Sequence, residues 1–83
     1  MKTYEFQCGG DHGSWDCIVD VELNEEEENL LVSYVNKTGE RRLSSYPPYT
    51  DLFFKVLDAL EEQGVDGEDM SLVVVYVPDV FYQ

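Results

Sequence analysis

The fold is decided by two alternating stretches of sequence, TYEFQC at residues 3–8 and WDCIVDVEL at residues 15–23. In each stretch every second side chain is hydrophobic, which is typical of a strand buried on one face. The turn-rich segment 9–14 lies between them. A symmetric antiparallel hairpin pairs the hydrophobic members of the two stretches with one another: Cys8 with Cys17, Phe6 with Val19 and Tyr4 with Val21. Pattern and register therefore agree, and together they predict a hairpin.

Residues 24–38 allow two interpretations. As a helix, the segment has Asn24 at the N-cap and Glu27 three residues on, a capping-box pair, and Gly39 to end it. As a second hairpin, it would turn at residues 36–39 with glycine in the bulge position. The four consecutive glutamates at 25–28 favour the helix, because acids are stabilised at a helix N-terminus and suit a strand poorly.

The second half of the chain predicts one more helix and one more strand. In the connector 40–49, Leu43 and Tyr46 are expected to tuck against the core. A strongly amphipathic helix follows, capped by Thr50 or Asp51 and closed by Gly64.

Residues 72–77, LVVVYV, are hydrophobic on both faces, which predicts a strand in the middle of a sheet or covered on both sides. Pro78 should end its pairing, and the hydrophobic tail 80–82 should pack. We therefore expect one α+β domain over residues 1–83, in the order ββααβ. Its small antiparallel sheet, the N-terminal hairpin plus the C-terminal strand, should pack against two helices.

The charge of the chain is extreme and uneven. Its 83 residues carry 18 Asp and Glu against 5 Lys and Arg, a net charge of −13, while 43% of the residues are hydrophobic. That hydrophobic content supports a packed core in spite of the charge. Residues 1–35 carry −8 and residues 61–83 carry −6, whereas residues 36–60 carry +1. Direct binding to nucleic acid or to an anionic membrane is electrostatically disfavoured, and a basic protein is the natural partner.

No motif in the sequence predicts a metal site, a cofactor or catalysis. Cys8, His12 and Cys17 lack the paired-cysteine knuckle of a structural zinc site, so we expect two core thiols and an exposed histidine. The loop 9–13 has no P-loop lysine, and the acidic turn 66–69 lacks the spacing of a calcium loop. His12 is the only histidine, and no nucleophile can be assigned to it from sequence. We therefore expect a protein that is not an enzyme.

The acidic surface is the strongest candidate for a binding site. Asp16, Asp20 and Glu22 lie on the outward face of the second predicted strand, with neighbouring outward positions about 6.8 Å apart. Glutamates at the start of the helix would extend this surface directly. The predicted partner-binding residues form one acidic ridge: Asp16, Asp20, Glu22, Glu25, Glu26 and Glu28. A row of carboxylates imitates a short piece of the field of a nucleic acid duplex, which carries about one charge per 1.7 Å.

Two functional hypotheses follow from these features. The first is an inhibitor or decoy that engages the basic nucleic-acid-binding surface of a larger protein such as a nuclease. Short acidic anti-defence proteins of phages and mobile elements, including anti-CRISPR proteins, are similar in size and composition, but no motif is shared with them. The second is an adaptor or subunit that binds through exposed aromatic residues in the segments 46–49 and 81–82. In that case the acidity would serve only solubility.

The sequence also suggests a location and an oligomeric state. Residues 2–6 do not resemble a secretory leader, and the longest apolar run is no longer than a strand. We therefore expect a cytoplasmic protein with reduced cysteines. The nearly neutral segment 36–60 would suit a homodimer contact as well as a contact with another protein.

Overall fold

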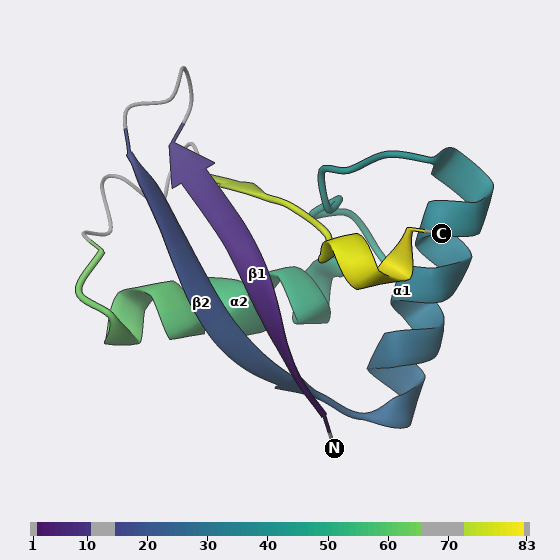
Figure 1. The fold of residues 1–83 in the computed structure, drawn as a ribbon, viewed down its shortest axis with the longest axis horizontal. Coiled ribbons are helices and arrows are strands. Elements are labelled where there is room, and N and C mark those ends of the chain that lie inside the picture. The colour runs from purple at the N-terminus through teal and green to yellow at the C-terminus, as the bar shows by residue number, and fades with distance from the viewer. Residues whose placement is uncertain (1, 11–14, 66–72, 83) are drawn as a thin grey trace.

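The structure, a computed structural model, describes residues 2–10, 15–65 and 73–82 (Figure 1). Two strands, two helices and a third strand follow one another along the chain, and a short 3₁₀ helix comes last. The elements are β1 (Lys2–Gly10), β2 (Asp16–Leu23), α1 (Glu25–Thr38), α2 (Thr50–Glu62), β3 (Val73–Val75) and η3 (Asp79–Phe81). The predicted α+β class and the order ββααβ are confirmed.

β1 and β2 form the predicted antiparallel hairpin in the predicted register. The three hydrophobic pairs lie opposite one another: Cys8 with Cys17, Phe6 with Val19 and Tyr4 with Val21. Phe6, Cys8, Val19 and Val21 are all buried, whereas the residues between them are exposed on the other side of the sheet. The register is fixed because a slip of one residue would move this whole hydrophobic set to the surface.

The third strand joins the opposite side of β1, so the strand order is β2-β1-β3 and β1 is central. The sequence predicted a strand in the middle of a sheet or covered on both sides, and the first alternative is wrong, because β3 is an outer strand of the sheet. Backbone hydrogen bonds nevertheless reach this part of the chain from both sides, beginning within β3, where the Val75 carbonyl accepts the Leu43 N–H at 2.7 Å. Tyr76 donates its backbone N–H to Gln7 of β1, and Val77 donates to Arg41 of the connector. Pro78 has no N–H to continue the ladder, and pairing ends there as predicted.

α1 confirms the helix interpretation of residues 24–38 and excludes the second hairpin. Asn24 Oδ1 accepts the Glu27 N–H at 2.8 Å, and Glu27 Oε1 accepts the Asn24 N–H at 2.9 Å. This capping box satisfies two of the backbone donors that a helix start leaves unpaired. Gly39 ends the helix in the left-handed conformation, with φ of 66°, and its N–H bonds to the Val35 carbonyl.

α2 runs as predicted, but its start differs from the expectation. The N-cap is Tyr49, and no side chain caps the helix. The Thr50 hydroxyl, one of the two predicted caps, donates to the Ser45 carbonyl instead and so closes the turn before the helix. Gly64 follows the helix with a φ of 96°, in the role expected of a C-terminal glycine.

Both α1 and α2 pack on one side of the sheet, and neither of them covers the other side. In Figure 1, α2 passes behind β1 and β2, while α1 stands beside the lower end of the hairpin. One hydrophobic cluster joins the two layers, and its most deeply buried side chains are Phe6, Cys8, Val19, Leu23, Leu31, Leu52, Val56, Leu60 and Val75. None of the helices in the described ranges is long and apolar enough to cross a membrane.

The connector and the tail were predicted in part. Leu43 is buried at 5% exposure, as expected, but Tyr46 is 77% exposed, so the expectation that it packs against the core was wrong. The turn at residues 46–49 sits at the start of α2 and turns Tyr46 outward, whereas Tyr49 packs edge-on against Tyr34. The prediction for the tail holds in part: Phe81 packs against Tyr4 with the ring centroids 5.0 Å apart, but Val80 is 61% exposed.

Candidate protein-binding face

The outward side of β2 carries the first half of the predicted ridge. Asp16, Asp20 and Glu22 alternate with the buried hydrophobic residues of the strand, and all three are exposed. Since α2 covers the opposite side of the sheet, these carboxylates lie on the face that neither α1 nor α2 covers. Ile18, which is 57% exposed, lies among them on the same face.

Sequence reasoning missed one member of this face, Glu5 of β1. In the hairpin register Glu5 lies directly opposite Asp20. Gly10 donates its N–H to Trp15, which makes the even-numbered positions of β1 the hydrogen-bonded ones toward β2. Glu5 and Asp20 therefore form a non-hydrogen-bonded pair, the closer kind, with Cα atoms about 4.5 Å apart. The predicted register already contained this pair, and reading it across both faces of the hairpin would have found Glu5.

The second half of the ridge lies in the first turn of α1. Glu25 and Glu26 are exposed and Glu28 is half-buried. β2 leads into α1 through Asn24 alone, so the acidic end of the helix directly adjoins the acidic face of the strand.

Glu27, the remaining acid of this run, has an internal role. Besides its bond to the Asn24 N–H, its carboxylate accepts from the Lys55 ammonium group at 2.9 Å and ties α1 to α2.

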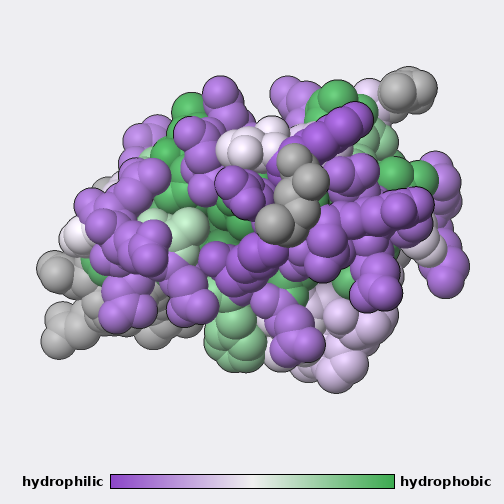
Figure 2. All heavy atoms as spheres, turned by 90° about the horizontal axis from the view of Figure 1, so that it is seen from below, coloured by the Kyte–Doolittle hydropathy of each residue, from purple (hydrophilic) through white to green (hydrophobic). Residues whose placement is uncertain are grey.

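The ridge is not neutralised by its described neighbours. Among residues 2–10, 15–65 and 73–82, the ion pairs found are Glu27 with Lys55 and Asp79 with Arg41, and neither involves a ridge residue. Seen from below in Figure 2, hydrophilic side chains cover much of the surface, with hydrophobic groups showing between them. Carboxylates gathered without counter-charges raise the local negative potential, which attracts cations and basic proteins.

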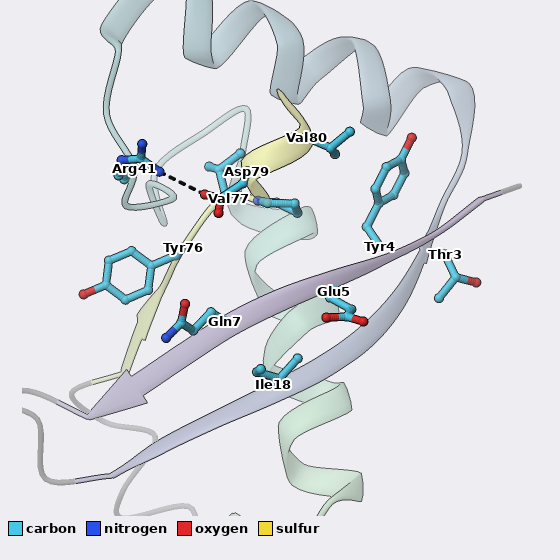
Figure 3. Close-up of a pocket in the computed structure, with 11 residues that line it drawn as sticks. Thr3, Tyr4, Glu5, Gln7, Ile18, Arg41, Tyr76, Val77, Asp79 and Val80 are labelled. Carbon is cyan, nitrogen blue, oxygen red and sulfur yellow. Dashed lines mark hydrogen bonds and ion pairs between the residues drawn. The ribbon is translucent and has the colours of Figure 1, made fainter. Parts of the chain in front are cut away.

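A hollow of about 680 Å³ lies on the same face, between the outward side chains of β1 with Ile18 of β2 and the segment 76–80 (Figure 3). Outward residues of β1 form its floor, and the segment 76–80 forms its wall. Arg41 closes one end through an ion pair of 3.0 Å with Asp79. Both side chains of this pair are mostly exposed, so it adds little stability. Glu5 borders both the hollow and the ridge, and the lining includes no cysteine or histidine.

The adaptor hypothesis depends on exposed aromatic residues, and the structure leaves one of the four rings in the segments 46–49 and 81–82 exposed and packs the other three. Tyr46 stands free at 77% exposure. Tyr49 contacts Tyr34, Phe81 contacts Tyr4, and Tyr82 lies under the Arg41 guanidinium at 4.7 Å from its ring centre. The hydroxyl of Tyr82 also donates to the Glu40 carbonyl, which fixes the tail to the connector.

The two cysteines are free thiols that face each other across the hairpin. Cys8 is fully buried, and burial, with a smaller effect from Cys17, raises the pKa of its thiol to about 12. A thiol held neutral in this way is inert as a nucleophile and as a metal ligand.

The other sequence predictions on metal and phosphate sites fall largely outside the described residues. No cluster of three potential metal-ligating side chains occurs in the ranges that the structure covers. His12, most of the loop 9–13 and the acidic turn 66–69 lie outside those ranges.

Comparisons with known proteins return no match, neither among protein-family models, nor among curated proteins, nor among solved structures.

Proposed function

We propose that this protein is a binding module whose open, acidic sheet face engages the basic nucleic-acid-binding surface of a larger protein. In this role it acts as an inhibitor or decoy, as anti-defence proteins of mobile elements do against nucleases. The proposed contact residues are the predicted ridge together with Glu5, which lies opposite Asp20. The proposed compartment is the cytoplasm, and the free thiols of Cys8 and Cys17 are consistent with it.

The observation that carries this proposal is the close pair of Glu5 and Asp20. Like charges directly opposite each other on neighbouring strands destabilise a sheet, by up to about 1 kcal/mol. The pair lies on the face that neither α1 nor α2 covers, and the ion pairs among the described residues lie elsewhere. A basic partner would relieve this repulsion on binding, so the unfavourable pair contributes to affinity.

The spacing of the charges also suits this partner. Carboxylates on two adjacent strands and on the following helix turn make a broad negative surface instead of a single row. Such a surface attracts a protein built to bind phosphates and speeds its encounter. Because most of these carboxylates are exposed, the attraction should weaken strongly with salt.

An adaptor that binds through aromatic residues is the second candidate, and the exposure of Tyr46 is the observation that favours it. Exposed tyrosines are frequent anchors at protein interfaces. Tyr49, Phe81 and Tyr82 are already packed, so this candidate depends on Tyr46 and the prolines beside it. If Tyr46→Ala removes binding to a partner and charge reversals on the ridge do not, the adaptor function is the correct one.

Competition with DNA tests the decoy function. Immobilised host-defence nucleases are presented with the protein in rising concentrations of NaCl, with and without duplex DNA. We expect binding that weakens as salt rises, that duplex DNA displaces, and that Asp20→Lys and Glu26→Lys reduce. Binding that is indifferent to salt, or that occurs together with bound DNA, would remove the proposed mechanism.

A further inference from the structure

β2 is an outer strand of the sheet, and none of the described residues forms a further strand beside it. The hairpin contacts of Gly10 with Trp15 place the odd-numbered residues of β2 in hydrogen-bonded pairs with β1. The backbone of Gln7 confirms this alternation. Gln7 is an odd-numbered residue of β1, and its carbonyl accepts the Tyr76 N–H on the side of β1 that faces away from β2. Asp16, Ile18, Asp20 and Glu22 consequently turn their backbone N–H and C=O groups away from β1, toward the outer edge.

One side-chain amide already forms a hydrogen bond to the backbone of this edge. Gln63, which follows α2, donates its Nε2–H to the Ile18 carbonyl at 3.4 Å and accepts the Cys17 thiol at 3.2 Å. Gln63 is itself exposed. The Ile18 carbonyl is therefore accessible from outside the sheet and takes an amide donor of the kind that another strand would offer. Elsewhere along this edge, the described residues contribute no backbone hydrogen bond to Asp20 or Glu22 beyond the hairpin.

Charge decides which strand would suit this edge. Unprotected edges promote pairing between copies of a protein, and charged side chains are a common means of preventing it. Asp16, Asp20 and Glu22 would meet the same three acids of a second copy, so self-pairing is repelled. A segment with lysine or arginine at alternate positions has the opposite charge at the same spacing.

We propose that β2 binds its partner by strand addition, accepting an extended basic segment of the partner as a fourth, antiparallel strand. This inference rests on the proposed function and names the form of the basic partner. Main-chain hydrogen bonds from the Asp16–Glu22 edge hold the segment, and the carboxylates select its side chains.

The antiparallel geometry fixes which residues of the segment contact β2. In an antiparallel pair, residues that exchange hydrogen bonds have their side chains on the same face of the sheet. Asp20 and Glu22 point to the open face, so the residues bonded to them must place their basic side chains there too. The basic residues of the segment therefore use their own N–H groups to bind the edge, and the intervening residues turn theirs to solvent.

N-methylated peptides test this geometry with the full-length protein. The probe is a capped peptide of alternating arginine and threonine, equal in length to β2. One version carries N-methyl groups on the arginines and another carries them on the threonines, so charge is identical in all three. We expect methylation of the arginines to weaken binding by about tenfold or more, as loss of several hydrogen bonds requires, and methylation of the threonines to leave it nearly unchanged.

A matched pair of variants tests the same edge from the side of the protein. Ile18→Pro removes an N–H that faces outward and is tolerated on an outer strand, while Ile18→Ala shortens the side chain and keeps the N–H. Both retain the net charge, and circular dichroism checks that both fold. We expect the unmethylated peptide to bind Ile18→Pro about tenfold more weakly than Ile18→Ala.

The outcomes separate strand addition from charge attraction. Suppose that the peptide with methylated arginines binds as tightly as the one with methylated threonines, while binding still weakens with salt. Strand addition is then wrong, and charge attraction to the acidic face accounts for the binding. If no peptide binds even at low salt, strand addition and the proposed function both fail. Dimerisation of the protein through this edge, without peptide binding, would also overturn the proposal in favour of a second copy as the occupant.

Discussion

At the scale of single residues, Glu5 and Asp20 link the fold to the proposed function. The register that buries Phe6 and Val19 on one face necessarily sets these two acids opposite each other on the other face. The hydrophobic pattern alone was sufficient to predict this pairing, because one-residue slips are prohibited by burial. Glu5 was missed as a site residue because the acids were read along β2 and not across the sheet.

Tyr46 and Thr50 show where residue-level prediction failed. A tyrosine beside two prolines gives no sign of whether its ring faces the core, and that depends on how the turn 46–49 enters α2. Thr50 is a good N-cap residue by type, but its hydroxyl reaches the Ser45 carbonyl. Local turn contacts of this kind compete with helix capping, and the sequence does not show which contact forms.

Cys8 gives a prediction in alkaline solution. Its pKa is raised from 9.0 to about 12, chiefly by burial, so the unfolded chain loses this proton first as the pH rises. The contribution of this thiol to the free energy of unfolding should therefore be constant below pH 9 and should fall above it, by about 1.4 kcal/mol per pH unit. Urea titrations between about pH 8 and pH 11 measure the slope.

Cys8→Ala is the control for this slope. The variant should show a shallower fall in the free energy of unfolding, with the raised pKa values of Tyr34 and Tyr82 accounting for part of what remains. An unchanged slope in Cys8→Ala would mean that the thiol does not cause the alkaline loss of stability.

At the scale of elements, the capping box decides between the two interpretations of residues 24–38. Four glutamates in a row are a poor strand and a good first helical turn, and Asn24 with Glu27 supplies the cap. The sequence was sufficient here because both the start and the end of the helix carry strong local signals. The sequence was insufficient to place β3 in the sheet. Hydrophobicity on both faces does not tell whether a strand or a connector such as 41–43 lies on each side of it.

Asn24→Ala should weaken α1 measurably. The substitution removes the acceptor for the Glu27 N–H and disturbs the Glu27 carboxylate that binds Lys55. We expect the free energy of unfolding to fall by about 1 kcal/mol in denaturant titrations. Asn24→Ser, which keeps a capping oxygen, should lose much less. Equal losses in the two variants would show that the cap is unimportant to the stability of the helix.

At the scale of the whole molecule, the layered fold separates two kinds of surface. The helices cover one side of the sheet and bury the hydrophobic cluster, so the outward residues of β1 and β2 are left to face solvent on the other side. Seven of the 18 acidic residues, Glu5 and the six residues of the ridge, lie on this face and the adjoining helix start. This clustering, and not the net charge alone, is the basis of the proposed binding function.

The measurement that tests the central claim most directly compares the affinities of Asp20→Lys and Glu62→Lys for a nuclease that binds the unmodified protein. Both variants change the net charge equally, but Asp20 lies on the open face, whereas Glu62 ends α2 in the other layer. Asp20→Lys also places a lysine opposite Glu5, so its fold should be as stable as the original or slightly more stable. We expect it to bind at least about fivefold more weakly, roughly 1 kcal/mol, with little change for Glu62→Lys. Equal affinities for the two variants would contradict the account.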